Sequence, residues 1–189
     1  CMDSGLIDAV YIATPNTYHQ KFSEIAAEYG VHILCEKPMA TNVASCLSMI
    51  DKAKKHDVKL MVAYRLHFES ANLLVADMAT KSQIGDPKIF NATFTMQVRD
   101  TTNIRLDRKL GGGTLHDLGI YCINAARNIF REEPIEVFAI GANSDDPRFR
   151  EVYETTSAIL KFNAGRVATF TASFGATESS VFELIGTEK

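Results

Sequence analysis

The sequence predicts an α/β unit followed by an α+β unit: the C-terminal part of a domain built on a parallel sheet, then a domain with an open, mostly antiparallel sheet and flanking helices. Two observations predict it. In the first third, continuous apolar runs are separated by segments with helical spacing, which is typical of βαβ units. After Tyr64 the character changes, and toward the end apolar and polar residues alternate with period two. We therefore expect two domains, 1–64 and 65–189.

The elements of the first unit follow from apolar runs and their stop signals. Gly30 is a natural end for a helix, and Thr41 or Asn42 can cap the next one. The pattern predicts strands over 8–13, 31–35 and 59–63, and helices over 17–29 and from the cap to His56.

The second unit mixes helices and longer strands. The pattern predicts helices over 70–82 and 114–130, a strand over 88–98, a hairpin of strands 151–162 and 166–174 around the turn 163–165, and a last strand over 182–187. The strand 166–174 has two distinct faces. We expect one face to pack under the helices, and it consists of Ala168, Phe170, Ala172 and Phe174. The other face, with Thr169, Thr171 and Ser173, is uncharged and is expected to meet another subunit in a homo-oligomer.

Composition and charge argue against several classes of function. Hydrophobic residues make up 46% of the chain and charged residues 23%, near the averages of globular domains. Lysine and arginine together number 20 against 23 aspartates and glutamates, so no nucleic-acid partner is expected. No apolar run approaches the roughly 20 residues of a membrane span. The four cysteines form no CxxC pair, which favours reduced thiols in a cytoplasmic protein and no metal site.

Three clusters carry candidate chemistry, and the first is Ala13-Thr14-Pro15-Asn16 with His19 one turn later. Ligands of open parallel sheets bind at the carboxyl ends of the strands, and a helix N-terminus there suits a dinucleotide. The alternative is an ordinary turn in which Asn16 or Thr17 caps the helix.

The second cluster is Glu36-Lys37-Pro38, at the end of a predicted buried strand. A partly desolvated lysine suits proton transfer at neutral pH, and the proline fixes the backbone beside it and can be cis. The alternative is a surface ion pair followed by a loop proline.

The third cluster is the segment GGGTLHDLGIY, from Gly111 to Tyr121. Glycines permit a tight turn and the close approach of a ligand. Asp117 and Tyr121 are four residues apart and share a helix face, whereas His116 points elsewhere and is expected to be structural. A phenol near a lysine ammonium ionises more easily, so Tyr121 is a candidate acid/base group. The alternative is a loop, a helix cap at Asp117 and a tyrosine packed in the core.

A polar stretch upstream contributes cations, namely Arg99, Arg105, Arg108 and Lys109. It can meet a phosphate or carboxylate, or it can be a solvated loop.

The order ATPNTYH, CEKP, AYR and GGGTLHDLGIY, at these separations, resembles the family of glucose–fructose oxidoreductase and inositol dehydrogenase, the Gfo/Idh/MocA oxidoreductases. The resemblance covers essentially the whole chain and is strongest to the glucose–fructose oxidoreductase branch. It implies a Rossmann domain that binds NAD or NADP, followed by an α+β domain that covers the nicotinamide and often forms a dimer interface. It implies a dehydrogenase that transfers a hydride between that cofactor and a sugar or polyol.

The resemblance also implies roles for single residues. It places Lys37 beside nicotinamide and substrate, and Asp117 and Tyr121 at the sugar site, as the catalytic group. It implies cofactor contacts by Thr14, Pro15, Asn16, His19, Glu36, Pro38, Arg65 and Arg105. Many members have His where this sequence has Tyr121, so a Lys–Tyr acid/base pair is expected. We expect the Lys37 ammonium within one substrate width, roughly 4–8 Å, of the Tyr121 hydroxyl or the Asp117 carboxylate.

Two features of the family pattern are missing from this sequence. The GxGxxG phosphate loop and the residue that chooses NAD over NADP do not occur, and the chain begins Cys1-Met2-Asp3, so we expect a piece of a longer protein that binds cofactor weakly by itself. Two other functions stay open: a non-catalytic binding or regulatory protein on the same fold, and a fragment that serves only as a dimerisation sheet.

Overall fold

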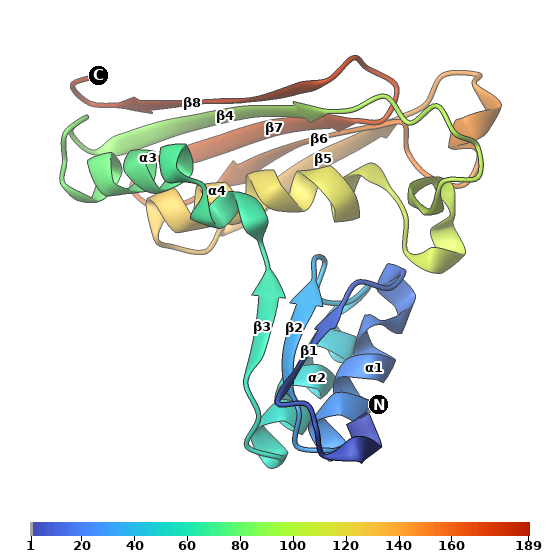
Figure 1. Cartoon of the computed structure of the whole chain (residues 1–189). Coiled ribbons are helices and arrows are strands. Elements are labelled where there is room, and N and C mark those ends of the chain that lie inside the picture. The colour runs from blue at the N-terminus through green and yellow to red at the C-terminus, as the bar shows by residue number, and fades with distance from the viewer. Residues whose placement is uncertain (1) are drawn as a thin grey trace.

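Two sheets organise the chain (Figure 1). The computed structural model describes residues 2–189. The first sheet contains β1 (Ala9–Ile12), β2 (His32–Glu36) and β3 (Leu60–Ala63), all parallel and in the order β1-β2-β3. Their carboxyl ends point toward the second unit, so residues that follow these strands lie at the boundary between the units (Figure 1).

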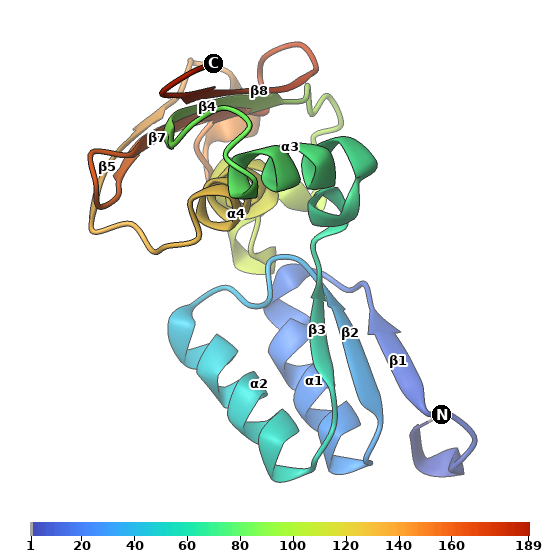
Figure 2. The same ribbon diagram turned by 90° about the vertical axis from the view of Figure 1, so that its left-hand side faces the viewer.

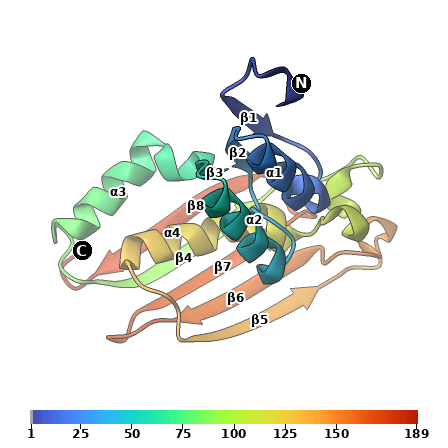
Figure 3. The same cartoon turned by 90° about the horizontal axis from the view of Figure 1, so that it is seen from below.

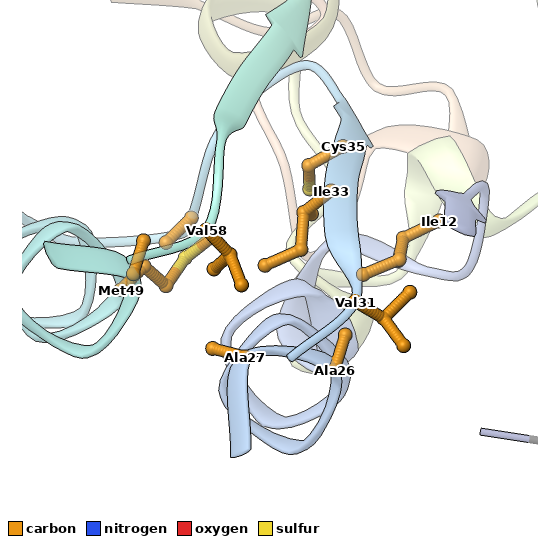
Figure 4. Packing of buried hydrophobic residues seen from close by; sticks show 10 residues of the cluster. Ile12, Ala26, Ala27, Val31, Ile33, Cys35, Met49 and Val58 are labelled. Carbon is orange, nitrogen blue, oxygen red and sulfur yellow. The ribbon is translucent and has the colours of Figure 1, made fainter. Parts of the chain in front are cut away.

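One face of the first sheet is covered by α1 (His19–Glu28) and α2 (Val43–Lys55), as Figure 2 shows. Their small and apolar side chains interlock with those of the strands in one buried cluster (Figure 4), and burying this surface stabilises the unit. Asn42 caps α2 by accepting a hydrogen bond from Ser45 N at 2.9 Å, as the sequence predicts. The predicted helix 17–29 begins two residues later, because Asn16–Tyr18 forms a 3-10 turn.

The opposite face of this sheet carries one row of large side chains, one from each strand. Tyr11, Leu34 and Met61 pair in register across the strands, and 56%, 37% and 49% of their respective surfaces are exposed. Within the described residues no helix covers this row (Figure 2).

The second sheet has five strands in the order β5-β6-β7-β4-β8. The strands are β4 (Pro87–Thr95), β5 (Glu136–Ala142), β6 (Thr155–Lys161), β7 (Val167–Ser173) and β8 (Ser179–Gly186). Only β4 and β7 pair in parallel, so the sheet is mostly antiparallel, as predicted. The helices α3 (Ser70–Thr80) and α4 (Ile120–Phe130) lie against one face, between the sheet and the first unit (Figures 1 and 3).

The predicted inner face of β7 is confirmed. Ala168, Phe170, Ala172 and Phe174 are each at most 3% exposed, and they belong to clusters that include residues of α4. Ser173 is also buried, contrary to its predicted place on an open face. The reason is local: its hydroxyl bonds Thr155 Oγ1 and accepts from the turn that follows β7.

Other differences are at element ends. The segment predicted as one helix over 114–130 is a π-helical turn, Leu115–Gly119, followed by α4. The strand expected over 88–98 runs from Pro87 to Thr95, and the one expected over 151–162 is shortened to β6. The edge strand β5 was not predicted, because its run EVFAIGA has no clean alternation.

Within residues 2–189, no helix combines the length and apolarity that crossing a bilayer requires. The same residues contain no cluster of three histidine, cysteine or acidic side chains suited to a metal. Cys35 and Cys122 are buried free thiols and Cys46 is a half-buried one, whereas Cys1 lies outside the described residues.

Candidate active site

The two units meet at an ion pair between Lys37 and Asp117. Lys37 leaves the carboxyl end of β2, and its Nζ lies 2.5 Å from Asp117 Oδ1 and 2.8 Å from the Asp117 carbonyl oxygen. Only 12% of the lysine side chain and 13% of the aspartate side chain are exposed. The predicted meeting of these residues is confirmed, but at direct contact rather than one substrate width apart.

Asp117 stands in the π-helical turn Leu115–Gly119. Single π-turns are uncommon and occur often at functional sites. Here the turn presents both the carbonyl and the carboxylate of Asp117 to the lysine ammonium. The backbone geometry therefore contributes directly to holding Lys37.

A second cation completes the cluster. Arg105 Nε donates to Asp117 Oδ2 at 2.6 Å, so each carboxylate oxygen has a cationic partner. Arg105 lies in the 3-10 turn Ile104–Leu106, and 38% of its side chain is exposed. The two ion pairs hold the Asp117 carboxylate from both sides.

Tyr121 lies beside this cluster but contacts it through its ring. Lys37 Nζ is 4.9 Å from the ring centroid, and the ring packs edge-on against Tyr64 and at a tilt against Phe94. Burial, followed by the repulsion of Glu36, raises the pKa of Tyr121 to about 12. The expected easier ionisation is therefore wrong: the ammonium faces the ring, and desolvation disfavours the phenolate.

The loop Gly111–Gly113 packs against the first unit. Gly111 has φ +83°, and a Cβ there would lie 2.7 Å from Thr41 Cγ2 and 2.8 Å from Asn16 Cβ. Asn16 Nδ2 donates to Gly111 O at 2.8 Å. At Gly112 a Cβ would lie 2.4 Å from the Arg105 carbonyl oxygen. The close approach that the sequence predicts is thus made by the protein's own first unit, and the loop positions Arg105.

A hollow of about 330 Å³ opens beside the ion pair, and we call it the Lys37 hollow. It gathers six of the predicted site residues from both units: Thr14, Asn16, Glu36, Lys37, Arg105 and Asp117. Glu36 is fixed there, because one carboxylate oxygen accepts from the Tyr11 hydroxyl and the other from Lys37 N at 3.1 Å.

The other predicted cofactor residues lie differently. Pro15 supplies the carbonyl that starts the turn Asn16–Tyr18, and Pro38 is buried and follows a cis peptide bond. Arg65 does not join the site: its side chain is 72% exposed and pairs with Glu69 at 2.9 Å. Its position after β3 turns it toward solvent along a short 3-10 helix, Arg65–Phe68.

His19 also differs from its predicted cofactor contact. The side chain is fully buried. Nδ1 lies 2.8 Å from Pro38 O, and Nε2 lies 3.0 Å from Thr14 O. A ring with no exposed surface and both nitrogens against the backbone is part of the interior and has no free edge for a ligand.

A second hollow, of about 370 Å³, is lined in part by Tyr121, and we call it the Tyr121 hollow. Its lining includes Leu66, His67, Phe94, Tyr121, Asn124 and Ser180. The sequence interpretation missed His67 and Asn124. Their spacing in the chain carries no motif, and only the fold brings the residues after β3 next to α4.

Known proteins match both units. The "Oxidoreductase family, NAD-binding Rossmann fold" matches residues 1–64, and the "GFO/IDH/MocA C-terminal domain" matches residues 73–189. The NADP(+)-dependent D-xylose 1-dehydrogenase of Haloarcula marismortui is 36% identical over 191 residues, which cover 98% of this chain and 53% of that protein. The chain spans about half the length of the curated relatives it matches.

Two solved structures resemble this chain over nearly its whole length. The aldose-aldose oxidoreductase from Caulobacter crescentus, complexed with glycerol, matches with a TM-score of 0.94 and 36% identity, over 98% of this chain and 56% of that one. A levoglucosan dehydrogenase in complex with NADH and levoglucosan matches with a TM-score of 0.88 and 27% identity, over 98% and 54% of the two chains.

Proposed function

Because the chain belongs to the Gfo/Idh/MocA oxidoreductase family, we propose that it forms part of an NAD(P)-dependent dehydrogenase that transfers a hydride between nicotinamide and a hydroxyl-bearing carbon of a sugar or polyol. The observation that carries the proposal is the Lys37–Asp117 ion pair at the carboxyl end of β2. An ionisable amine that is held at a strand end, beside a hollow, suits proton transfer in such a reaction.

The Lys37 hollow fits the nicotinamide end of the cofactor. Its walls offer hydrogen-bonding groups at Thr14, Asn16 and Glu36, which suit a carboxamide and a ribose. When it is bound, the nicotinamide supplies the hydride chemistry. In this proposal Thr14, Asn16 and Glu36 hold that end of the cofactor, and NAD and NADP remain equal candidates.

Lys37 moves the proton. In oxidation the Lys37 side chain takes the proton of the substrate hydroxyl as the hydride leaves the same carbon, and the carbonyl forms. In reduction the Lys37 ammonium returns that proton to the carbonyl oxygen. Asp117 orients the amine and balances its charge, and Arg105 fixes the second carboxylate oxygen.

Tyr121 supports the substrate rather than acting as a base. With a pKa of about 12 it remains a phenol at neutral pH, and a phenol can donate a hydrogen bond to a sugar oxygen. The Tyr121 hollow adds polar side chains at His67, Asn124 and Ser180 and an aromatic wall at Phe94. This mixture suits a sugar ring, which has polar edges and an apolar face.

The experiment that tests this proposal uses the full-length protein with NAD and NADP in turn, against a panel of aldoses, glycosides and polyols. The measurement is the nicotinamide absorbance over time. Reduction of one cofactor by at least one sugar or polyol is expected. No reduction with any pair would contradict the proposal, provided that the protein is folded by circular dichroism.

Three features support finer proposals. The two units divide between Tyr64 and Arg65, giving a cofactor domain and a substrate domain. The described cysteines are free thiols, which supports a reducing, cytoplasmic compartment.

The open face of the second sheet is the proposed site of self-association. It carries exposed side chains in neighbouring rows, Phe138 and Ile159 in one and Ile140 and Val181 in the next.

A further inference from the structure

We propose that His19 is a positioning residue of the reaction: its buried ring fixes the loop that carries Lys37 against the loop that carries Thr14 and Asn16. The inference rests on the proposed function for its catalytic consequence. Its structural content, that His19 sets the position of Lys37, is tested separately from catalysis below.

The geometry joins two loops through one rigid side chain. His19 is the first residue of α1 and has no exposed surface. Its Nδ1 is 2.8 Å from the carbonyl oxygen of Pro38, the residue after Lys37. Its Nε2 is 3.0 Å from the carbonyl oxygen of Thr14, two residues before Asn16. The imidazole thus lies between the loops that follow β1 and β2 and contacts both.

Both partners are hydrogen-bond acceptors. A carbonyl oxygen cannot donate, so the ring donates to at least one of these loops whichever nitrogens carry hydrogen. The Pro38 contact is buried and the Thr14 contact is part-buried, and a buried main-chain carbonyl that loses its donor has no water to replace it. The bridge is therefore costly to break, and this keeps both loops in one arrangement.

The two loops carry groups that must act together. Lys37 reaches across to Asp117, and Thr14 and Asn16 line the same hollow. Hydride and proton transfer depend on fixed distances between reacting groups, and a misplacement of about 1 Å can cost about 10²-fold in rate. His19 touches neither hollow and acts only through the backbone of its two partners.

The alternative is that His19 only fills space in the core. Three variants distinguish this packing role from the proposed positioning role. His19→Phe keeps an aromatic ring but removes every hydrogen bond that the imidazole makes, and His19→Gln restores a donor to one carbonyl. Met49→Ala is the matched control. Met49 lies in the core of the same unit, is 1% exposed, and belongs to α2 rather than to the site loops.

The first readout does not need turnover. The lysines of the full-length protein are acetylated in competition with a trace reagent, and mass spectrometry measures the extent at each lysine. Lys37, paired and 12% exposed, is expected to react at least about 10-fold more slowly than Lys81, which is 60% exposed. We expect His19→Phe to remove most of this protection and Met49→Ala to keep it. Unchanged protection of Lys37 in His19→Phe overturns the proposal, whether or not the protein is an active enzyme.

The second readout is kinetic. We expect His19→Phe to lower kcat about 10–100-fold with a much smaller change in the KM for the sugar, and His19→Gln to recover part of the loss. Met49→Ala, at the same fall in Tm, is expected to keep kcat. Equal losses of kcat in His19→Phe and Met49→Ala would assign His19 a packing role only. Failure of the wild-type protein to turn over any sugar would instead count against the proposed function, and the acetylation result would still decide the role of His19.

Discussion

The ammonium of Lys37 lies 2.5 Å from the carboxylate of Asp117, although eighty residues of chain separate the two. Lys37 directly follows β2 of the parallel sheet, and Asp117 stands in a π-helical turn next to the second sheet. Their contact, together with the bond from Asn16 to Gly111, ties the loops of the first unit to the second. The candidate chemistry therefore depends on how the two units meet.

Asp117→Asn is expected to lower kcat about 10²–10³-fold in the full-length enzyme. The substitution keeps the shape of the side chain but removes the charge that faces Lys37 and Arg105. Steady-state kinetics measure the effect, and Glu136→Gln is the control, since it breaks an exposed ion pair with Lys161. Equal kcat values for Asp117→Asn and the wild-type protein would remove Asp117 from the site.

Gly111→Ala is expected to destabilise the contact between the units. The new methyl group meets Thr41 and Asn16 at less than 3 Å, in addition to the strain of a left-handed backbone, which costs about 1–2 kcal/mol. Gly165→Ala is a matched control, with φ +71° and nothing within 4 Å of the added atom. We expect Gly111→Ala to lose at least about 1 kcal/mol more than the control in chemical unfolding. Equal losses would show that the loop does not press on the first unit.

Stability is expected to fall at alkaline pH. Burial raises the pKa of Tyr121 to about 12, that of Cys35 to about 11 and that of Cys122 to about 12. Between the usual pKa values of these groups and the raised ones, the unfolded chain has lost protons that the folded chain still holds. The free energy of unfolding therefore decreases as pH rises from about 9 to about 12.

Urea unfolding at a series of pH values measures this decline. Tyr121→Phe is expected to make it shallower above about pH 10, because the variant has no phenol to ionise in the unfolded state. Tyr153→Phe is the control, since Tyr153 is 59% exposed. An identical slope for Tyr121→Phe and the wild-type protein would argue against a desolvated Tyr121.

The open face of the second sheet is expected to associate with a second copy of the protein. Phe138→Glu places a charge among the exposed apolar rows and is expected to convert a dimer to a monomer in sedimentation velocity at micromolar concentration. Leu6→Glu is the control, because Leu6 is 86% exposed and lies in the first unit. A wild-type monomer under these conditions rules out the association.

Much of this arrangement could be predicted from local sequence. Apolar runs and stop residues predicted the three parallel strands and their two helices, and the alternation in β7 predicted its buried face. The clusters around Lys37 and Asp117 were singled out because one ends a predicted buried strand and the other follows three glycines, and each alone left an ordinary structural alternative open. The family resemblance added that the two should meet.

The remainder depended on contacts that no local pattern encodes. His19 has the same sequence context whether it faces a cofactor or two carbonyl groups, and only the fold shows the second. The pKa of Tyr121 is raised first by burial and then by the repulsion of Glu36, and neither follows from the spacing of residues along the chain. Arg65 and Arg105 are both cations near motifs, yet one pairs with Glu69 in solvent and the other with Asp117 in the site.

The most direct test of the central claim, that Lys37 moves the proton in a nicotinamide-dependent oxidation of a sugar or polyol, is a single-turnover measurement on the full-length protein. Enzyme in excess over substrate, with saturating NAD or NADP, is followed by nicotinamide absorbance for the wild-type protein and Lys37→Met. We predict rapid formation of the reduced cofactor by the wild-type protein and a rate about 10²–10⁴-fold lower for Lys37→Met, with cofactor affinity nearly unchanged. Equal single-turnover rates for the two proteins would contradict the account.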